Sequence, residues 1–400
     1  MRLLSPFFSI GAVVVSILTE LDLFEASIEG VTDPRFGWQA RHFLIDILFI
    51  GLCSILSGGD GYDDMEFFGN ERKDWFMKYL ELPFGIPSES TFRRVFEGLD
   101  PKEFSEALNR FASYLGSMGS ASTPEHIALD GKSARRSFCS DDEGNKTDML
   151  HTVSAYDTKT GLCLGQVSTS NKSNEITAIP ELLTLLDISG SIVTIDAMGC
   201  QKRISTSIRA GKADYILALK ENHAELFKSV EKVFSTIEDL HLVESPLVFH
   251  EVDKGHGRIE QRSYLAIEKE TLWGDSSEWC DFQTIVMVQA TREQKGQISV
   301  SRRYYISSLE PDSRLLAYGI RKHCGIESMH WLLDVVFRED YSRTRTKNGQ
   351  ANMKILRRWA LNILKANKKQ KVSMKKKRWN AAMDVNYLEE LLFQSNVLPS

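Results

Sequence analysis

The spacing of apolar positions divides the 400-residue chain into a helical first part and a second part that is rich in strands. Up to residue 115 the apolar residues recur mainly at helical intervals, and Ser88 and Pro101 stand where new helices can begin. Residues 116–124 are mostly small and polar, which favours a linker. We therefore expect an N-terminal helical domain at 1–115, joined by this linker to a domain of a different type.

Beyond the linker, short apolar runs alternate with segments of helical period, as in a mixed α/β sheet. Strands are expected at residues 126–130, 150–156, 162–169, 191–196 and 214–219, with helices at 174–187 and 201–210. A further helix and three strands predict a β-rich insertion at about 221–300. One helix from Asp312 or Ser313 to about Val336 would then complete an α/β core at 125–340.

Two apolar runs near the N-terminus have more than one explanation. Residues 3–18 resemble a short export signal, but the run contains serines and a proline, and no small-residue cleavage site precedes Glu20. Residues 43–56 contain Asp46 and are too short to span a bilayer. We favour packed helices for both runs, keep an export signal as the alternative for the first, and expect no membrane partner.

Composition is that of an ordinary globular chain, with 42% apolar and 26% charged residues, which excludes collagen-like and disordered classes. The six cysteines are scattered and show neither a C-x-x-C pair nor the Cys/His spacing of a zinc site. A reduced chain in the cytoplasm is the expected setting.

The charge of the chain is unevenly distributed. The net charge is −5, but residues 341–380 contain 14 Lys or Arg and no Asp or Glu, so the other 360 residues carry 35 basic against 54 acidic groups. Such a segment predicts a basic helical tail at 341–400 that binds the DNA backbone by releasing counterions. Its candidate DNA contacts are Arg357, Arg358, Lys375, Lys376, Lys377 and Arg378.

A second candidate for DNA recognition lies in the helical domain. Short helices joined by a tight turn near Ser88 carry Arg93 and Arg94, which is compatible with a helix-turn-helix reader. A helical cap that packs on the main domain explains the same pattern, so both interpretations stay open.

Two acidic residues end apolar strands of the expected sheet. Asp130 and Asp196 would lie at the carboxyl ends of these strands, where open α/β sheets place their ligands. On the later helix, Glu327, His330 and Asp334 share one face, and Glu327 supplies the third carboxylate that a Mg²⁺ site calls for. The E-x-x-H spelling of this helix also occurs in di-iron bundles, which need a second copy that the sequence lacks.

Five ordered segments together resemble the H-repeat-associated insertion-sequence transposases, and the resemblance extends from about residue 10 to about residue 390. The segments are 130–132, 194–202, 214–220, 255–260 and 326–335. This resemblance implies an RNase H-like core and a DDE catalytic triad at Asp130, Asp196 and Glu327. The chain departs from the family pattern at Cys324, where a Trp is usual, and at residues 221–223, where Gly-Asn-Gln is usual.

The family likeness also implies a reaction and its partners. The triad would hold Mg²⁺, with Mn²⁺ able to substitute, and the enzyme would cleave double-stranded DNA at terminal inverted repeats and join the ends to target DNA. A homodimer on DNA, associated with the nucleoid of a prokaryote, is the expected assembly. Lys132, Arg258 and Arg262 are candidates for phosphate contacts, and His330 would either orient a phosphate or pack around Trp331.

Two other functions remain compatible with these residues. One is an RNase H-like nuclease that cuts without strand transfer. The other is a catalytically inactive or domesticated transposase relic that still binds DNA.

Overall fold

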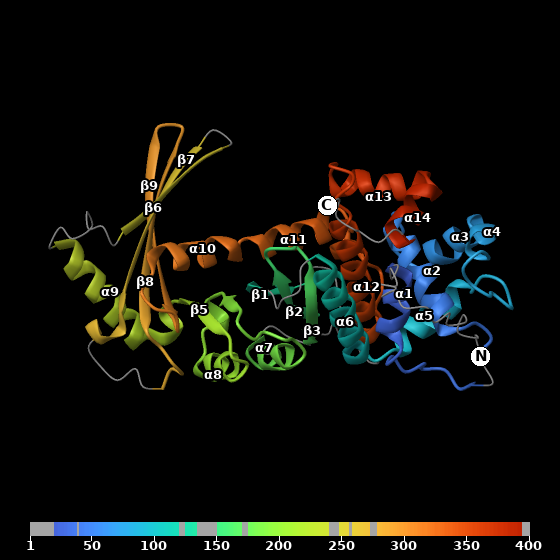
Figure 1. Cartoon of the computed structure of the whole chain (residues 1–400), viewed down its shortest axis with the longest axis horizontal. Helices are drawn as coiled ribbons and strands as arrows, with labels where there is room; N and C mark the ends of the chain where they lie inside the picture. The colour runs from blue at the N-terminus through green and yellow to red at the C-terminus, as the bar shows by residue number, and fades with distance from the viewer. Residues whose placement is uncertain are drawn as a thin grey trace, which may run out of the picture.

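Three regions follow one another along the long axis of the molecule (Figure 1). The computed structural model describes residues 20–37, 40–119, 125–133, 150–169, 175–239, 248–255, 258–272 and 278–393. A bundle of helices occupies one end, a sheet with helices on both faces lies in the middle, and long strands form an arm at the other end. The apolar run 3–18 lies outside the described residues. None of the described helices combines the length and the apolar character that crossing a bilayer requires.

The helical region contains segments from both ends of the chain. Its N-terminal helices are α1 (Glu20–Ile28), α2 (Leu44–Leu56), α3 (Tyr62–Glu71), α4 (Lys73–Phe76), α5 (Glu89–Gly98) and α6 (Pro101–Gly119). Its C-terminal helices are α12 (Lys347–Ala366), α13 (Met374–Met383) and α14 (Val385–Phe393). Helix α12 packs against α2, α5 and α6, and all three C-terminal helices contribute to the same hydrophobic core as α1–α6.

This packing corrects two expectations. The segment predicted to be a separate basic tail contains the central helix of the helical region, because one face of α12 is apolar and lies against α2, α5 and α6. The expected linker is also shorter than predicted, since α6 continues to Gly119 and residues 120–124 lie outside the described part of the chain. Helix α5 buries Phe92, Val95 and Phe96, as the helical-cap interpretation requires.

The expected mixed α/β core is confirmed, and its described strands form one nine-stranded sheet in the order β3-β2-β1-β4-β5-β9-β8-β7-β6. The five strands of the core are β1 (His126–Ser133), β2 (His151–Asp157), β3 (Cys163–Thr169), β4 (Ile192–Ile195) and β5 (Asp214–Leu219). β1, β4 and β5 are parallel, whereas β2 and β3 are antiparallel to their neighbours. Helices α7 (Glu175–Thr184) and α8 (Lys202–Ala210) lie on one side of these strands (Figure 1).

Helices α10 (Ser313–His323) and α11 (Gly325–Val335) cross the opposite face of the core strands (Figure 1). The sequence predicted one helix here, and the structure divides it at Cys324, whose backbone stays in the right-handed helical region. Gly325 follows directly, where an added Cβ would lie only 3.0 Å from the ring of Tyr156. The missing side chain of Gly325 therefore lets the start of α11 approach Tyr156 of β2 closely.

The predicted insertion continues the same sheet instead of forming a separate one. It contains α9 (Ala224–Asp239), β6 (Val248–Gly255), β7 (Arg258–Glu268), β8 (Thr284–Gln294) and β9 (Gln297–Ser307). β9 pairs with β5, so backbone hydrogen bonds connect these four strands directly to the core. We call the part of β6–β9 that extends beyond α10 the arm (Figure 1).

We expect the substitution Trp359→Ala to destabilise the helical region strongly. Trp359 of α12 is fully buried, with its ring 5.1 Å from those of Phe24 and Phe104 and 5.7 Å from that of Phe111. Its loss should lower the free energy of unfolding by about 3–5 kcal/mol, measured by denaturant titration. Trp379→Ala is the matched control because Trp379 is 64% exposed. An equal effect of the two substitutions would contradict the central position of α12.

Candidate active site

The first two acids of the predicted triad stand side by side on neighbouring parallel strands. Leu129 of β1 pairs with Ile195 of β4, so Asp130 and Asp196 occupy the next position of each strand. Asp130 is half-buried, and Asp196 is exposed just beyond the end of β4. One oxygen of Asp196 accepts hydrogen bonds from the backbone amides of Met198 (3.1 Å) and Gly199 (3.4 Å), which orients the carboxylate at the sheet edge.

The third acid approaches the same place from the helices above the sheet. Glu327 lies exposed in the first turn of α11, and His323 ends α10 just before it. Burial lowers the pKa of His323, while the negative charges of Asp130, Asp196 and Glu327 act on the ring in the opposite direction. The three acids are therefore near enough to this half-buried imidazole for their charges to act on it.

His323 is a residue of the site to which the sequence analysis assigns no role. Its ring Nδ1 lies 2.9 Å from the hydroxyl oxygen of Thr194, a buried residue of β4 two positions before Asp196. The available signal was its spacing, because His323 precedes Glu327 by four residues, which is one helical turn. Only the packing of α10 on β4 shows that the imidazole lies among acids from three elements.

The kind of donor at this site suits a hard divalent cation, because carboxylate oxygens are the ligands that Mg²⁺ and Mn²⁺ prefer. Within the described ranges, however, no group of three or more His, Cys, Asp or Glu side chains is close enough to hold a metal ion. In the described part of the chain the three acids thus lie near His323, but their side chains are not close enough together to form a metal site.

Two further candidates on this face contact other side chains of the protein. His330 Nδ1 lies 3.4 Å from Asp130 Oδ2, so the ring faces the first acid of the triad, while Trp331 is largely exposed. Lys132 pairs with Asp334 and, at 3.1 Å, with Glu339 Oε1. Its side chain is only 10% exposed. Contrary to our expectation, the ammonium group of Lys132 is held by Asp334 and Glu339 of the protein itself and does not project from the surface toward a phosphate.

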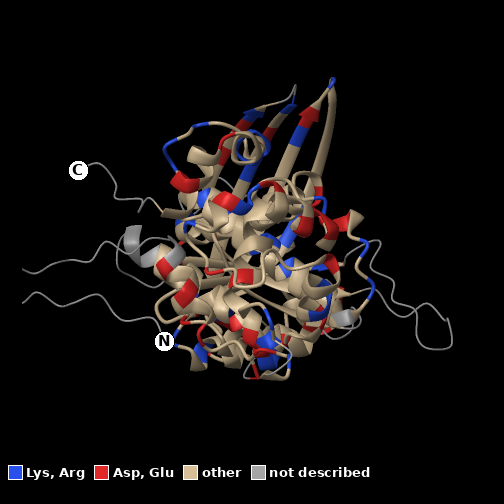
Figure 2. Ribbon diagram, turned by 90° about the vertical axis from the view of Figure 1, so that its right-hand side faces the viewer, with Lys and Arg blue, Asp and Glu red and all other residues tan. Residues whose placement is uncertain are grey.

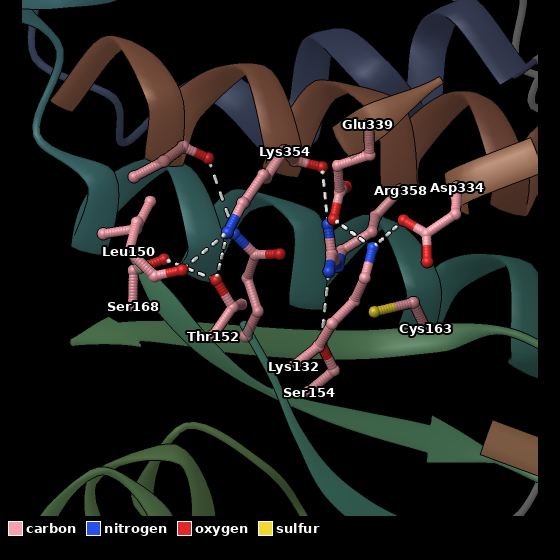
Figure 3. A network of polar contacts seen from close by, with 12 residues as sticks. Lys132, Leu150, Thr152, Ser154, Cys163, Ser168, Asp334, Glu339, Lys354 and Arg358 are labelled. Atoms are coloured by element: carbon pink, nitrogen blue, oxygen red, sulfur yellow. Dashed lines mark hydrogen bonds and ion pairs between the residues drawn. The ribbon is translucent and has the colours of Figure 1, made fainter. Parts of the chain in front are cut away.

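A network of buried charges connects this lysine to the central helix (Figure 3). Glu339 Oε2 accepts a hydrogen bond from Arg358 Nη1 of α12 at 2.9 Å, and Lys354 of α12 donates to Thr152 Oγ1 of β2, also at 2.9 Å. Burial alone would raise the pKa of Glu339, but the positive charges of Arg358 and Lys132 outweigh it and hold that pKa well below its ordinary range. The network thus keeps a fully buried carboxylate charged.

Four of the basic residues expected to contact DNA are buried in the structure, so the prediction is corrected for them. Arg357 donates to the carbonyl of Asp60 at 2.9 Å, and Arg358 to Glu339. Lys377 Nζ donates to the carbonyl of Leu364 at 2.8 Å. Arg378 Nη2 donates to the carbonyl of Ile55 at 2.7 Å. These cations satisfy buried oxygens of the protein, whereas Lys375 and Lys376 are exposed.

The arm carries a cluster of arginines around one carboxylate. Glu260 is buried, with Arg262 at 2.7 Å, Arg292 at 3.6 Å and Arg258 at 3.9 Å from its oxygens. The side chains of Arg258 and Arg292 are 45% and 47% exposed, whereas that of Arg262 is 11% exposed. Arg292 was missed in the sequence because it lies 30 or more residues further along and joins the others only through strand pairing.

This cluster lies on the same side of the sheet as the triad. Asp253 pairs with Glu260 across β6 and β7, so both side chains point to one face. Arg321 of α10 approaches Asp253 to 3.6 Å and Glu251 to 3.8 Å on that face. Basic positions recur along the arm strands up to their tips, with acidic positions among them (Figure 2).

Comparison with known proteins identifies the family. The family described as the transposase DDE domain matches residues 121–363, and the family of regions associated with that domain matches residues 26–112. The chain belongs to the DDE transposase family. The mixed α/β sheet of the structure agrees with the fold class expected for this family.

Proteins of Escherichia coli are among the relatives. One named as a transposase, YncI, is 37% identical over 91% of this chain and 93% of its own length. Another named as an H repeat-associated transposase, YhhI, is 35% identical over 94% of this chain and all of its own length. A shorter one named an inactive transposase, YbfQ, is 36% identical over 19% of this chain and 90% of its own length. A piggyBac transposase synaptic complex with hairpin DNA aligns at 12% identity over 96% of this chain and 86% of that chain, with a TM-score of 0.42 that carries no weight for function.

The departures of this transposase from its family pattern lie beside the acids. In η4 (Glu221–His223), Asn222 Nδ2 donates to the carbonyl of Ala197 at 2.9 Å, and His223 Nε2 lies 2.6 Å from the carbonyl oxygen of Cys200. Both contacts hold the segment that follows Asp196. Asn222 matches the usual residue, so of these two contacts only that of His223 comes from a departure from the family pattern.

We expect Lys354 to make the stability of this transposase depend on pH. Burial lowers the pKa of Lys354 from 10.5 to about 7. Between these values the unfolded chain binds a proton that the folded chain has released, so the wild type should gain stability as the pH rises. Lys354→Met should remove this gain, which amounts to at most about 1.4 kcal/mol per pH unit.

Denaturant titrations of both proteins at about pH 7.5 and about pH 9 measure this effect. Lys376→Met is the matched control because Lys376 is exposed. Equal pH dependence of the wild type and Lys354→Met would show that the buried lysine stays protonated throughout.

Proposed function

We propose that this chain is an active, metal-dependent DDE transposase that cleaves DNA at the ends of its mobile element and joins the freed 3′ ends to target DNA. The observation that carries the proposal is the register of the parallel strands β1 and β4, which puts Asp130 and Asp196 side by side, with Glu327 on the helix α11 that packs on β1. Each acid comes from a different element, and all three lie on the α10–α11 side or the edge of one sheet.

Asp130, Asp196 and Glu327 would hold the Mg²⁺ or Mn²⁺ ions of the reaction. When bound, such ions stabilise negative charge on the attacking and leaving oxygens of a phosphodiester. The protein itself holds the carboxylates in position. The amides of residues 198 and 199 fix Asp196, the amide of Gly131 donates to Asp130 Oδ1 at 2.9 Å, and His323 provides a polar group close to all three acids. Phosphoryl transfer depends mainly on such positioning and on charge neutralisation, so no covalent protein intermediate is needed.

The DNA would approach from the face that carries the triad and the arm arginines. Arg258 and Arg292 are exposed. Together with Arg262 they surround the single carboxylate of Glu260, so the cluster has a net positive charge. Lys375 and Lys376 offer a second basic site on α13. Because transposition joins two DNA ends, we propose that two copies of the chain assemble on DNA.

We expect Asp130→Asn and Asp196→Asn to abolish cleavage and joining while leaving DNA binding within about threefold of the wild type. Either change removes one ligand charge but keeps the shape of the side chain, so the loss of rate should be at least about a thousandfold. The assay incubates the full chain with Mg²⁺ and DNA that carries the repeats flanking its gene, and resolves nicked and joined products.

Asp187→Asn, which changes an exposed acid in the segment between α7 and β4, is the matched control. Cleavage by the wild type without joined products would favour a nuclease. Binding without cleavage would favour an inactive relic, the state named for the relative YbfQ.

We expect the double change Arg258→Ala and Arg292→Ala to weaken binding to all DNA sequences. Each lost phosphate contact should reduce the slope of log K against log salt concentration by about one. Fluorescence anisotropy at several salt concentrations measures the slope.

The control is Arg302→Ala, which removes an arginine from the opposite face of the arm, where its side chain donates to Gln289 Oε1 at 3.0 Å. Equal slopes for the double variant and the wild type would show that DNA does not contact this cluster.

A further inference from the structure

We propose that two side-chain contacts between β1 and α11, one from the acid Asp130 and one from the base Lys132, set the position of α11 along the strand. Because α11 carries Glu327, Lys132 and its partner Asp334 are positioning residues for this acid. The inference rests on the proposed function, because it concerns how the third acid of the triad is placed.

The spacing of the contacts matches strand to helix. Asp130 and Lys132 are two residues apart on β1, so their side chains lie on one face, about 6.6 Å apart along the strand. His330 and Asp334 are four residues apart on α11, which is about one helical turn of 5.4 Å. Asp130 faces His330 at 3.4 Å, and Lys132 pairs with Asp334. Two neighbouring side chains on one face of the strand therefore contact side chains from two successive turns of the helix.

The order of the charges makes this register specific. Along β1 the acid precedes the base, whereas along α11 the histidine precedes the acid. If α11 moved by one turn in one direction, Asp334 would lie opposite Asp130, and like charges at this separation repel. A shift in the other direction would bring His330 opposite Lys132. Apolar contacts alone would not distinguish these positions as sharply, because Ile326, Met329 and Leu333 recur at nearly equal intervals.

The strand is also fixed from its other face. An added Cβ at Gly131 would lie 2.8 Å from His151 Nε2 and would collide with the buried carboxylate of Glu175. β1 therefore lies directly against these side chains and has no room to move in that direction. The position of α11 along β1 is decided on the opposite face, by Lys132 and its partners.

Lys132 joins more than the helix to the strand. Its ammonium group also lies 3.1 Å from Glu339, which in turn accepts from Arg358 of α12 (Figure 3). The pair between Lys132 and Asp334 is thus connected to the core of the helical region. Buried ion pairs contribute little net stability compared with apolar packing, but they can specify one arrangement over others. Glu327 lies one turn before His330 and takes its position from this arrangement.

Asp334→Asn tests the proposal with little risk to folding, because the side chain of Asp334 is 32% exposed and α11 keeps its buried apolar residues. Mn²⁺ is the probe, titrated into the full chain and followed by the loss of the free-ion electron paramagnetic resonance signal. We expect Asp334→Asn to weaken Mn²⁺ binding about tenfold and to speed hydrogen exchange of residues 325–335, with an unchanged melting temperature.

Lys132 supplies the complementary comparison. Lys132→Met should weaken Mn²⁺ binding in the same way, and Lys132→Arg should restore it because arginine keeps the charge and can pair with Asp334. A merely structural role of Lys132, through its pair with Glu339, would lower the melting temperature of Lys132→Met but leave the Mn²⁺ affinity of the folded protein unchanged. Glu310→Gln, an exposed acid just before α10, is the matched control.

Two results would overturn the inference. If the wild type binds Mn²⁺ and yields joined DNA while Asp334→Asn matches it in affinity and exchange, the register contacts do not position Glu327, although the transposase function stands. If the wild type neither binds Mn²⁺ nor cleaves DNA, the proposed function fails, and the positioning role fails with it.

Discussion

The ionic contacts of the buried carboxylate of Glu339 connect the parts of the molecule on which the proposed chemistry depends. One oxygen accepts from Arg358 of the central helix α12, and the other lies 3.1 Å from Lys132 of β1, the strand that carries Asp130. A charged carboxylate without water is stable only when nearby cations compensate for its lost hydration. This requirement keeps α12 and β1 together. Since α12 packs among the N-terminal helices, it also joins the helical region to the sheet.

The sheet extends this connection to the arm. β9 pairs with β5, and β8, β7 and β6 follow in order, so the arm is held to the core by backbone hydrogen bonds across a continuous sheet. The arginine cluster around Glu260 therefore has a fixed direction relative to the acids. An insertion on a flexible linker would not give this relation, because its orientation would vary freely.

The C-terminal cations show where a charge pattern misleads. The run of 14 Lys and Arg without an acid was interpreted as a DNA-binding tail, and Lys375 and Lys376 are exposed as that interpretation requires. Arg357, Arg358 and Arg378, however, are buried and donate to carbonyl or carboxylate oxygens of distant segments. A sequence shows that a residue is charged but not how deeply it lies. The acceptors that make its burial tolerable are far away along the chain.

The sequence by itself determined the class of the fold, the presence of the strands at Asp130 and before Asp196, the helical segment that carries Glu327, and the family, although β1 continues past Asp130 to Ser133. Each follows from residues that are close in sequence or from the order of motifs. Only the tertiary structure decided that His323 lies among the three acids, that Arg292 joins the arm cluster, that α12 is a core helix, and that Lys132 pairs with Asp334. These features depend on which remote segments pack together and on how much water that packing excludes, and neither is encoded in local spacing.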